Sequence, residues 1–165
     1  MKLITSIAAS LCAVLGFAAP ALATCDTTSK TDAPTSRYVI GGGTVYDKKT
    51  NLTWQRCSVG QSWMEGMGCT GAVKNMAWDE AMKQATGGWR LPTKGELETL
   101  ISRRCSYPAM NDEVFPGMND IQKLSYWASN ENGNWDAWAV GFTYGYSYSG
   151  TKLNTFAVRL VRSGK

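Results

Sequence analysis

A loop that leads directly into a helix places the strongest constraint on how this chain folds. Residues 87–93 read Gly-Gly-Trp-Arg-Leu-Pro-Thr. Thr93 and Glu96 have the spacing of a capping box, in which the hydroxyl accepts from a helical amide and the carboxylate accepts from the cap amide. Pro92 cannot lie inside a helix, and it holds Leu91 extended. The sequence therefore predicts a helix that starts at Thr93.

Each of two predicted helices has one apolar face, and neither carries a catalytic motif. In the helix that follows Thr93, the apolar residues at helical spacing are Leu97, Leu100 and Ile101. An earlier helix is expected from about Asn75 to Ala85, ended by Gly87-Gly88. Its expected core face consists of Trp78, Ala81, Met82 and Ala85. Both helices are interpreted as scaffold.

Short segments with alternating character predict strands on both sides of the helices. They cover residues 38–40, 44–46, 52–56, 126–129, 137–142 and 156–162. In the last segment Phe156, Val158 and Leu160 share one face, which we expect to pack on the core. The pattern predicts an α+β single domain with two helices and short antiparallel strands.

The first 23 residues have the organisation of a signal peptide. A basic start precedes an apolar run, and Ala21-Leu22-Ala23 matches a signal peptidase site. The run is too short for a membrane span, and no later segment is apolar enough for a transmembrane segment. We expect an exported domain, periplasmic or extracellular. Residues 24–37 are polar and predict a flexible N-terminal segment before the folded domain at 38–165.

Four cysteines remain after the signal peptide is removed: Cys25, Cys57, Cys69 and Cys105. An even number in an oxidising compartment predicts two disulfides. The short, turn-rich loop between Cys57 and Cys69 favours that pair, which leaves Cys25 with Cys105. In a second interpretation, residues 22–25 resemble a lipobox, so that Cys25 carries a lipid and Cys105 has no partner.

The chain contains no histidine, and its formal net charge is only +4. The absence of histidine excludes Ser-His-Asp and Cys-His catalytic arrangements and removes the commonest transition-metal ligand. A nucleic-acid binder would show a denser basic face. We therefore expect no nucleic-acid partner, no metal and no cofactor.

Tryptophan and tyrosine, seven of each, supply the candidate contact residues. Those inside predicted helices, strands or the capping segment are interpreted as core: Trp54, Trp78, Trp89, Trp127 and Trp138. Trp63, between Cys57 and Cys69, stays open between core and surface.

A tyrosine ladder is predicted near the C-terminus, where Tyr144, Tyr146 and Tyr148 alternate with glycine and serine. In an extended strand these rings line one face, which suits a sugar or a protein partner. The alternative is that they cover the edge of the core. If a hairpin brings them next to Trp135, all four residues form one ligand-binding surface, which is the site we expect.

The loop that contains Trp135, residues 130–136, is rich in oxygen ligands, but its spacing matches no calcium-loop pattern. Basic residues offer a second kind of contact, to an anionic glycan. They are Arg103, Arg104, Lys123 and Lys152. A solvated surface is the simpler interpretation of these charges.

Six segments together resemble a known bacterial exported family, the C-terminal domain of the Legionella collagen-like protein. They are residues 43–47, 52–57, 87–93, 114–116, 126–129 and 158–162. The resemblance implies a C-type-lectin-like fold. The family member that gives the name is an adhesin for sulfated glycosaminoglycans on a collagen-like stalk. This chain has no Gly-x-y repeat, so trimeric adhesion does not follow.

The resemblance leads us to expect a non-catalytic recognition module that binds a surface glycan, acidic ones included, or a surface protein. Its oligomeric state cannot be read from the sequence. Two alternatives remain. The segment Trp89-Arg90-Leu91-Pro92-Thr93 is also similar to formylglycine-generating enzymes, which share that fold and use a reactive cysteine pair. A lipid on Cys25 would instead make this a cell-surface protein anchored to a membrane.

Overall fold

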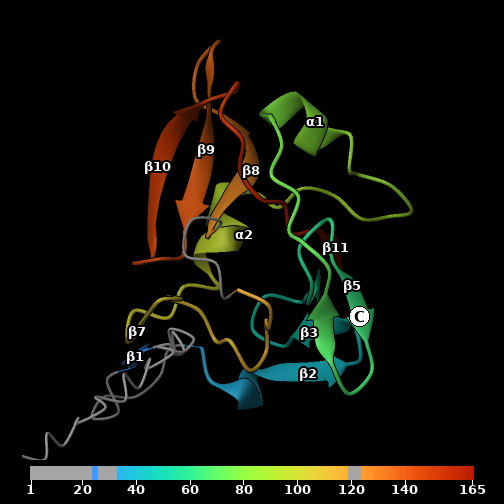
Figure 1. Ribbon diagram of the computed structural model, residues 1–165. Helices are drawn as coiled ribbons and strands as arrows, with labels where there is room; N and C mark the ends of the chain where they lie inside the picture. Colours follow the sequence, from blue (N-terminus) through green and yellow to red (C-terminus); the bar gives the residue numbers. More distant parts are fainter. Residues whose placement is uncertain (1–23, 26–32, 119–123) are drawn as a thin grey trace, which may run out of the picture.

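The computed structural model describes residues 24–25, 33–118 and 124–165, and it is an α+β domain dominated by antiparallel strands (Figure 1). The helices are η1 (Thr35–Arg37, a 3-10 turn), α1 (Trp78–Met82) and α2 (Lys94–Glu98). The first strands are β1 (Thr24–Cys25), β2 (Tyr38–Gly41), β3 (Thr44–Asp47), β4 (Leu52–Gln55), β5 (Ser62–Met64) and β6 (Gly68–Thr70). The later strands are β7 (Cys105–Ser106), β8 (Ser125–Glu131), β9 (Asp136–Gly141), β10 (Tyr146–Thr151) and β11 (Val161–Ser163).

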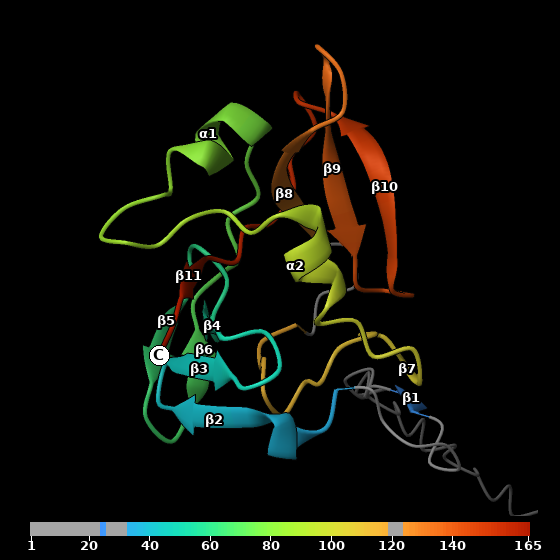
Figure 2. The same ribbon diagram turned by 180° about the vertical axis from the view of Figure 1, so that it is seen from behind.

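Two sheets form the body of the domain. One has the strand order β11-β4-β3-β2 and the other the order β10-β9-β8, while β1 pairs with β7 and β5 with β6 in small ribbons. The three-stranded sheet lies at one end of the molecule and β2 and β3 at the other, with α2 between them (Figures 1 and 2). Among the described residues, no helix has the length and apolar character needed to cross a membrane.

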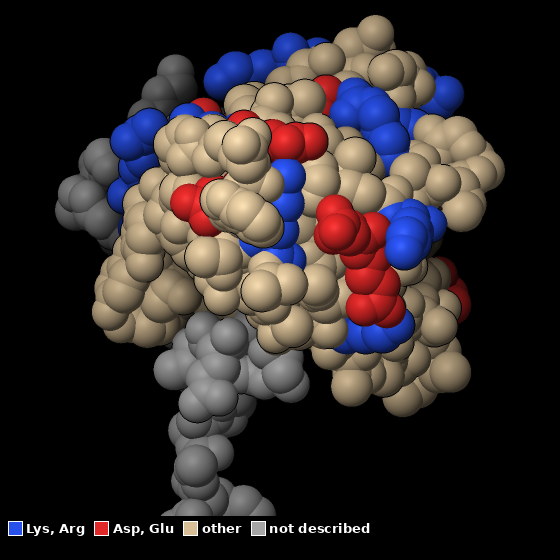
Figure 3. Space-filling view, turned by 90° about the horizontal axis from the view of Figure 1, so that it is seen from above, with Lys and Arg blue, Asp and Glu red and all other residues tan. Residues whose placement is uncertain are grey.

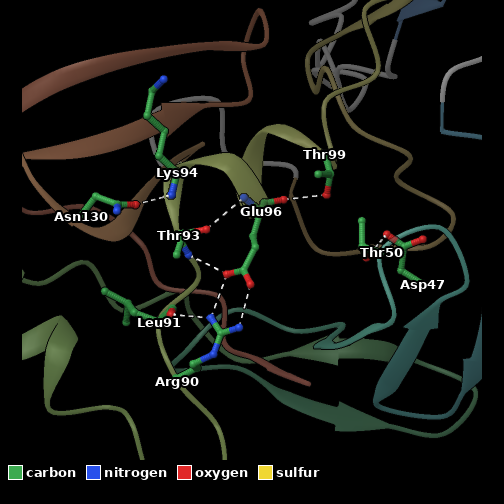
Figure 4. Close-up of polar contacts among 9 residues, drawn as sticks. All are labelled: Asp47, Thr50, Arg90, Leu91, Thr93, Lys94, Glu96, Thr99 and Asn130. Carbon is green, nitrogen blue, oxygen red and sulfur yellow. Dashed lines mark hydrogen bonds and ion pairs between the residues drawn. The ribbon is translucent and has the colours of Figure 1, made fainter. Parts of the chain in front are cut away.

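The capping box at the start of α2 is formed as the sequence predicts. The Glu96 amide donates to Thr93 Oγ1 (3.2 Å), and the Thr93 amide donates to Glu96 Oε2 (2.7 Å). Arg90 donates two further hydrogen bonds, of 2.7 and 2.8 Å, to the same carboxylate (Figure 4). Burial alone would raise the pKa of Glu96, but the bonds from Arg90 and Thr93 outweigh it and lower this pKa.

Both helices are shorter than expected. The α2 helix ends at Glu98, before the last two residues of the expected apolar stripe, because the chain turns and Ile101 pairs with Met110. The three residues of the expected apolar stripe are nevertheless buried: Leu97, Leu100 and Ile101. Their burial follows from spacing over one turn, which a short helix already provides.

The α1 helix covers Trp78–Met82 instead of residues 75–85. Met76 exchanges backbone hydrogen bonds with Phe156, and this bridge keeps the preceding chain extended. Trp78 and Ala81 are buried, whereas Met82 and Ala85 are exposed. Half of the expected core face is therefore wrong, because a helix of five residues presents only one or two side chains to the core.

The segment expected to form a strand over residues 156–162 is a strand only from Val161 onward. Its earlier residues change partners: Ala157 pairs with β8, and Val158 and Leu160 accept hydrogen bonds from residues 59 and 55. The segment thus crosses from one sheet to the other. Phe156, Val158 and Leu160 pack on one apolar cluster, as the sequence predicts. The residues between them, Ala157 and Arg159, are buried as well, so the segment is buried on both sides rather than on one.

Each face of the three-stranded sheet packs on its own apolar cluster. One face turns Tyr126 and Val140 towards Leu97 of α2. The other turns Trp127 and Ala139 towards Trp78 of α1. The five tryptophans expected in the core divide into two groups. Trp54, Trp78 and Trp127 are buried, and Trp89 and Trp138 are half-buried against the clusters.

The structure contains both favoured disulfides, Cys25–Cys105 and Cys57–Cys69. The signal peptide and part of the N-terminal segment, residues 1–23 and 26–32, lie outside the described residues. Residues 33–37 pack on the domain, where Arg37 Nε donates to buried Asp47 (2.7 Å). Burial would raise the pKa of Asp47, but hydrogen bonds from Arg37 and its neighbours lower it.

A buried arginine joins the two sheets. Arg159 is 1% exposed, and its guanidinium donates to the carbonyls of Gln55 (3.0 Å) and Arg56 at the end of β4. It also contacts Ser58 Oγ (3.3 Å) and the Tyr126 hydroxyl of β8 (3.5 Å). Among the described residues it has no carboxylate partner. The positive charge of Arg159 is therefore stabilised by carbonyl and hydroxyl oxygens instead of by a carboxylate.

We expect Arg159→Met to destabilise the domain by about 3 kcal/mol, because removing the donor leaves buried carbonyls unsatisfied. Urea unfolding measured by tryptophan fluorescence gives this change. Arg159→Lys keeps the charge but lacks the planar fork of donors of a guanidinium. Its stability should lie between that of Arg159→Met and that of the unchanged protein. Equal stability of all three proteins would show that the desolvation of the guanidinium cancels its hydrogen bonds.

Candidate functional site

Strand β9 separates the residues that the sequence placed on one binding surface. Its register with β10 pairs Asp136 with Thr151 at one end and Gly141 with Tyr146 at the other. Trp135 precedes the first pair, and Tyr144 lies beyond the second. Because β9 has six residues, these two ends are roughly 20 Å apart. The expected common surface is therefore not formed, and the molecule has a tryptophan end and a tyrosine end.

At the tyrosine end, Tyr144 lies in the turn before β10 rather than in the ladder. It is 61% exposed, and its ring lies 5.0 Å from that of Tyr107, to which its hydroxyl is hydrogen bonded. This bond raises the pKa of Tyr107. The turn needs Gly145, which has a φ of +76° and approaches so closely that a Cβ would lie 2.7 Å from Ile101 Cγ2.

Tyr146 and Tyr148 share one face of β10, with ring centroids 5.6 Å apart, but only Tyr146 is an exposed side chain. Tyr148 is half-buried against Phe156, at a centroid distance of 5.8 Å. Burial raises the pKa of Tyr148. Of the two interpretations of the ladder, covering the core edge describes Tyr148, and Tyr144 and Tyr146 remain as candidate contact residues.

A hollow of about 500 Å³ beside Tyr146 was not expected from the sequence. Two of its charged groups are paired with each other, since Lys94 lies 2.9 Å from Glu98, and Lys94 also lies 4.6 Å above the Trp138 ring. Hydrogen bonds from Ser147 and then Lys94 lower the pKa of Glu98. The only sequence signal for this arrangement is the spacing of Lys94 and Glu98 on one helix face.

The tryptophan end carries the most exposed large apolar side chains. Trp135 is 84% exposed and Leu153 is 88% exposed. They line a shallow hollow of about 420 Å³, here named the end surface, whose lining residues are Asp79, Asn134, Trp135, Thr151, Lys152 and Leu153. The tip of the β8–β9 hairpin and α1 lie at this same end of the molecule (Figure 1).

Lys152 holds the backbone of the end surface in place. Its Nζ donates to Glu131 Oε2 (3.0 Å) and to the Asn134 carbonyl (3.2 Å), and it lies 4.8 Å from the Trp78 ring. Its amide donates to the Trp135 carbonyl (2.8 Å). The backbone of Trp135 is therefore held in place, while its ring is left in solvent.

Charges of both signs surround the end surface. Figure 3, which views the molecule from this end, shows blue and red side chains interspersed among tan ones. The described basic residues do not gather on one surface, which agrees with the simpler interpretation of a solvated surface. Lys152 is neutralised here, Arg103 lines the hollow at the tyrosine end, Arg104 lines a third hollow beside Cys105, and Lys123 lies outside the described residues. Nothing at the end surface selects for strongly anionic ligands.

The described residues contain no group of three or more His, Cys, Asp or Glu side chains placed to hold a metal ion. Trp63, left open by the sequence, is half-buried, and the Arg56 guanidinium lies 4.2 Å from its ring. It thus covers a buried arginine. The end surface is left as an apolar contact surface on a fixed backbone.

The family model of the Lcl C-terminal domain matches residues 43–162. The chain belongs to this family. The matched residues of the Lcl C-terminal domain run from the turn before β3 into β11 and include both helices, the end surface and the tyrosine end. Among curated proteins, none matches the chain.

The stabilities of two aromatic variants should differ. Tyr148→Ala removes a half-buried ring that packs on Phe156. It should lower the free energy of unfolding by about 2 kcal/mol, less than the loss of a fully buried aromatic side chain. Trp135→Ala removes a ring that is in solvent and should leave the thermal midpoint nearly unchanged. Differential scanning calorimetry distinguishes them. An unfolded or strongly destabilised Trp135→Ala protein would mean that this ring packs on the domain.

Proposed function

We propose that this Lcl C-terminal domain is an exported, non-catalytic recognition module that binds a surface glycan or a surface protein through the end surface. The observation that carries the proposal is Trp135, whose ring is 84% exposed on a backbone held by Lys152. An exposed tryptophan on a fixed backbone offers a large contact area and loses little entropy on binding. Leu153 extends the apolar area beside it.

A glycan fits this surface better than an extended charged polymer does. The C–H face of a sugar ring packs on an aromatic ring, and the hydroxyls of the sugar need neutral or mixed polar partners. Asn134, Thr151 and Asp79 line the same hollow and supply such partners. A small protein epitope with an apolar centre meets the same chemistry.

The C-type-lectin-like fold is part of the proposal and rests on the family resemblance. Export rests on the family and on two disulfides, which form in oxidising compartments. The location is then periplasmic or extracellular.

The binding test is a glycan array probed with the purified domain, followed by titration of the strongest ligand. Trp135→Ala and Leu153→Ala should each weaken binding about tenfold or more, since each removes an apolar contact worth about 1.4 kcal/mol or more. Binding should not change when a chelator is added.

Tyr146→Ala is the matched control, because Tyr146 is an exposed aromatic residue at the opposite end of β9. It should keep full affinity. If Tyr146→Ala abolishes binding and Trp135→Ala does not, the recognition site is the tyrosine end, and the assignment to the end surface is wrong.

The formylglycine-generating type of enzyme and the lipid anchor both require a cysteine that is not in a disulfide. All four cysteines after residue 23 are paired in the structure. We expect thiol counting on the denatured, unreduced mature protein to find no free thiol. Two free thiols would favour the enzyme, and one free thiol with a lipid on Cys25 would favour the anchor.

A further inference from the structure

Strand β10 forms an open edge of the three-stranded sheet. It pairs with β9 on one side, and in both ribbon views it is the outermost strand, with no described segment beyond it (Figures 1 and 2). Its register with β9 is continuous over all six residues, whereas β8 pairs with β9 through an irregularity. The edge is therefore straight and regular, as a strand-pairing surface must be.

The backbone groups of alternate residues in β10 point away from β9. The Lys152 amide donates to the Trp135 carbonyl, and this pair continues the β9–β10 register. Hydrogen-bonded and non-hydrogen-bonded pairs alternate in an antiparallel ladder. Tyr146, Tyr148 and Gly150 therefore bond to β9, and Ser147, Ser149 and Thr151 face the open edge. The Thr151 carbonyl accepts from Asn154 (2.9 Å), which leaves five outward groups.

Those five groups are the amides and carbonyls of Ser147 and Ser149 and the amide of Thr151. Among the described residues, none outside the sheet pairs with them. The strand also lacks the features that usually protect an edge, since it has no charge, no proline and no bulge. By contrast β11, an edge of the other sheet, is three residues long and carries Arg162.

We propose that β10 pairs antiparallel with β10 of a second copy of this chain, so that two three-stranded sheets become one continuous sheet. The occupant is a second copy because the strand is complementary to itself. Outward-facing residues must pair with outward-facing residues, which places serine and threonine opposite serine and threonine. Tyrosines and glycine then lie opposite one another on the other face, and cross-strand aromatic neighbours stabilise such a pair.

Charge does not oppose this pairing. Two acids accept from the outward-facing serines: Glu98, which is paired with Lys94, accepts from Ser147 (2.6 Å), and Asp136 accepts from Ser149 (3.4 Å). Strand β10 itself has no charged residue. A two-fold axis perpendicular to the sheet keeps each apolar cluster on its own face and makes the interface closed. Thr151 belongs both to this edge and to the lining of the end surface, whereas Trp135 and Leu153 lie outside β10. The oligomeric state is therefore tested without any ligand.

The test is sedimentation velocity on the purified mature protein over a wide concentration range. We expect a dimer that dissociates on dilution. Ser149→Pro removes an outward amide without touching the bonds to β9, and should abolish the dimer. Ser149→Ala keeps that amide and is the matched control, which should remain dimeric.

Because proline could perturb the strand, Ser149→Lys provides a second disruption by placing a charge on the edge. It should be monomeric with a normal circular dichroism spectrum. Hydrogen exchange adds a local readout, since the Ser147 amide should be protected in the dimer and exchange rapidly in Ser149→Lys. A protein that stays monomeric at all concentrations, or a Ser149→Lys protein that dimerises as strongly as Ser149→Ala, overturns the proposal.

Discussion

A single buried guanidinium fixes the relation between the two sheets, and much of the domain depends on it. Arg159 lies where the chain crosses between the sheets, and it contacts β4 through carbonyls and β8 through Tyr126. Ser58 and Tyr126 are hydrogen bonded to each other at 2.7 Å, so the donors and acceptors around the charge form one network. Such a network has a defined geometry, which apolar packing alone does not give. The cost of burying the charge is offset by the partners of the two terminal nitrogens, while the buried Nε has no hydrogen-bond partner among the described residues.

The sequence predicted those elements that local chemistry determines. The capping box at Thr93 depends on four consecutive residues, and it forms with the expected partners. The ends of both helices were wrong because they depend on distant pairings, such as Ile101 with Met110 and Met76 with Phe156. A pattern of spacing contains no information about which remote strand competes for the next amide.

The same limit explains why the sequence did not predict how the residues of the candidate site are arranged. An exposed loop residue such as Trp135 can be recognised from its surroundings in sequence. Whether it meets Tyr146 depends on which ends of β9 and β10 are paired, and the pattern left that register unspecified. The residues that hold Trp135 were also not recognisable, because the partners of Lys152 come from the β8–β9 hairpin (Glu131 and Asn134) and from α1 (the Trp78 ring).

The contacts of Lys152 hold the backbone of the hairpin tip but leave its side chains free to vary. The ammonium bonds to the carbonyl of Asn134 rather than to its side chain, and the Lys152 amide bonds to the carbonyl of Trp135. These contacts place no demand on the side chains at positions 134 and 135. Other side chains at these two positions would therefore change what the hairpin tip can bind without removing the backbone contacts that set its shape.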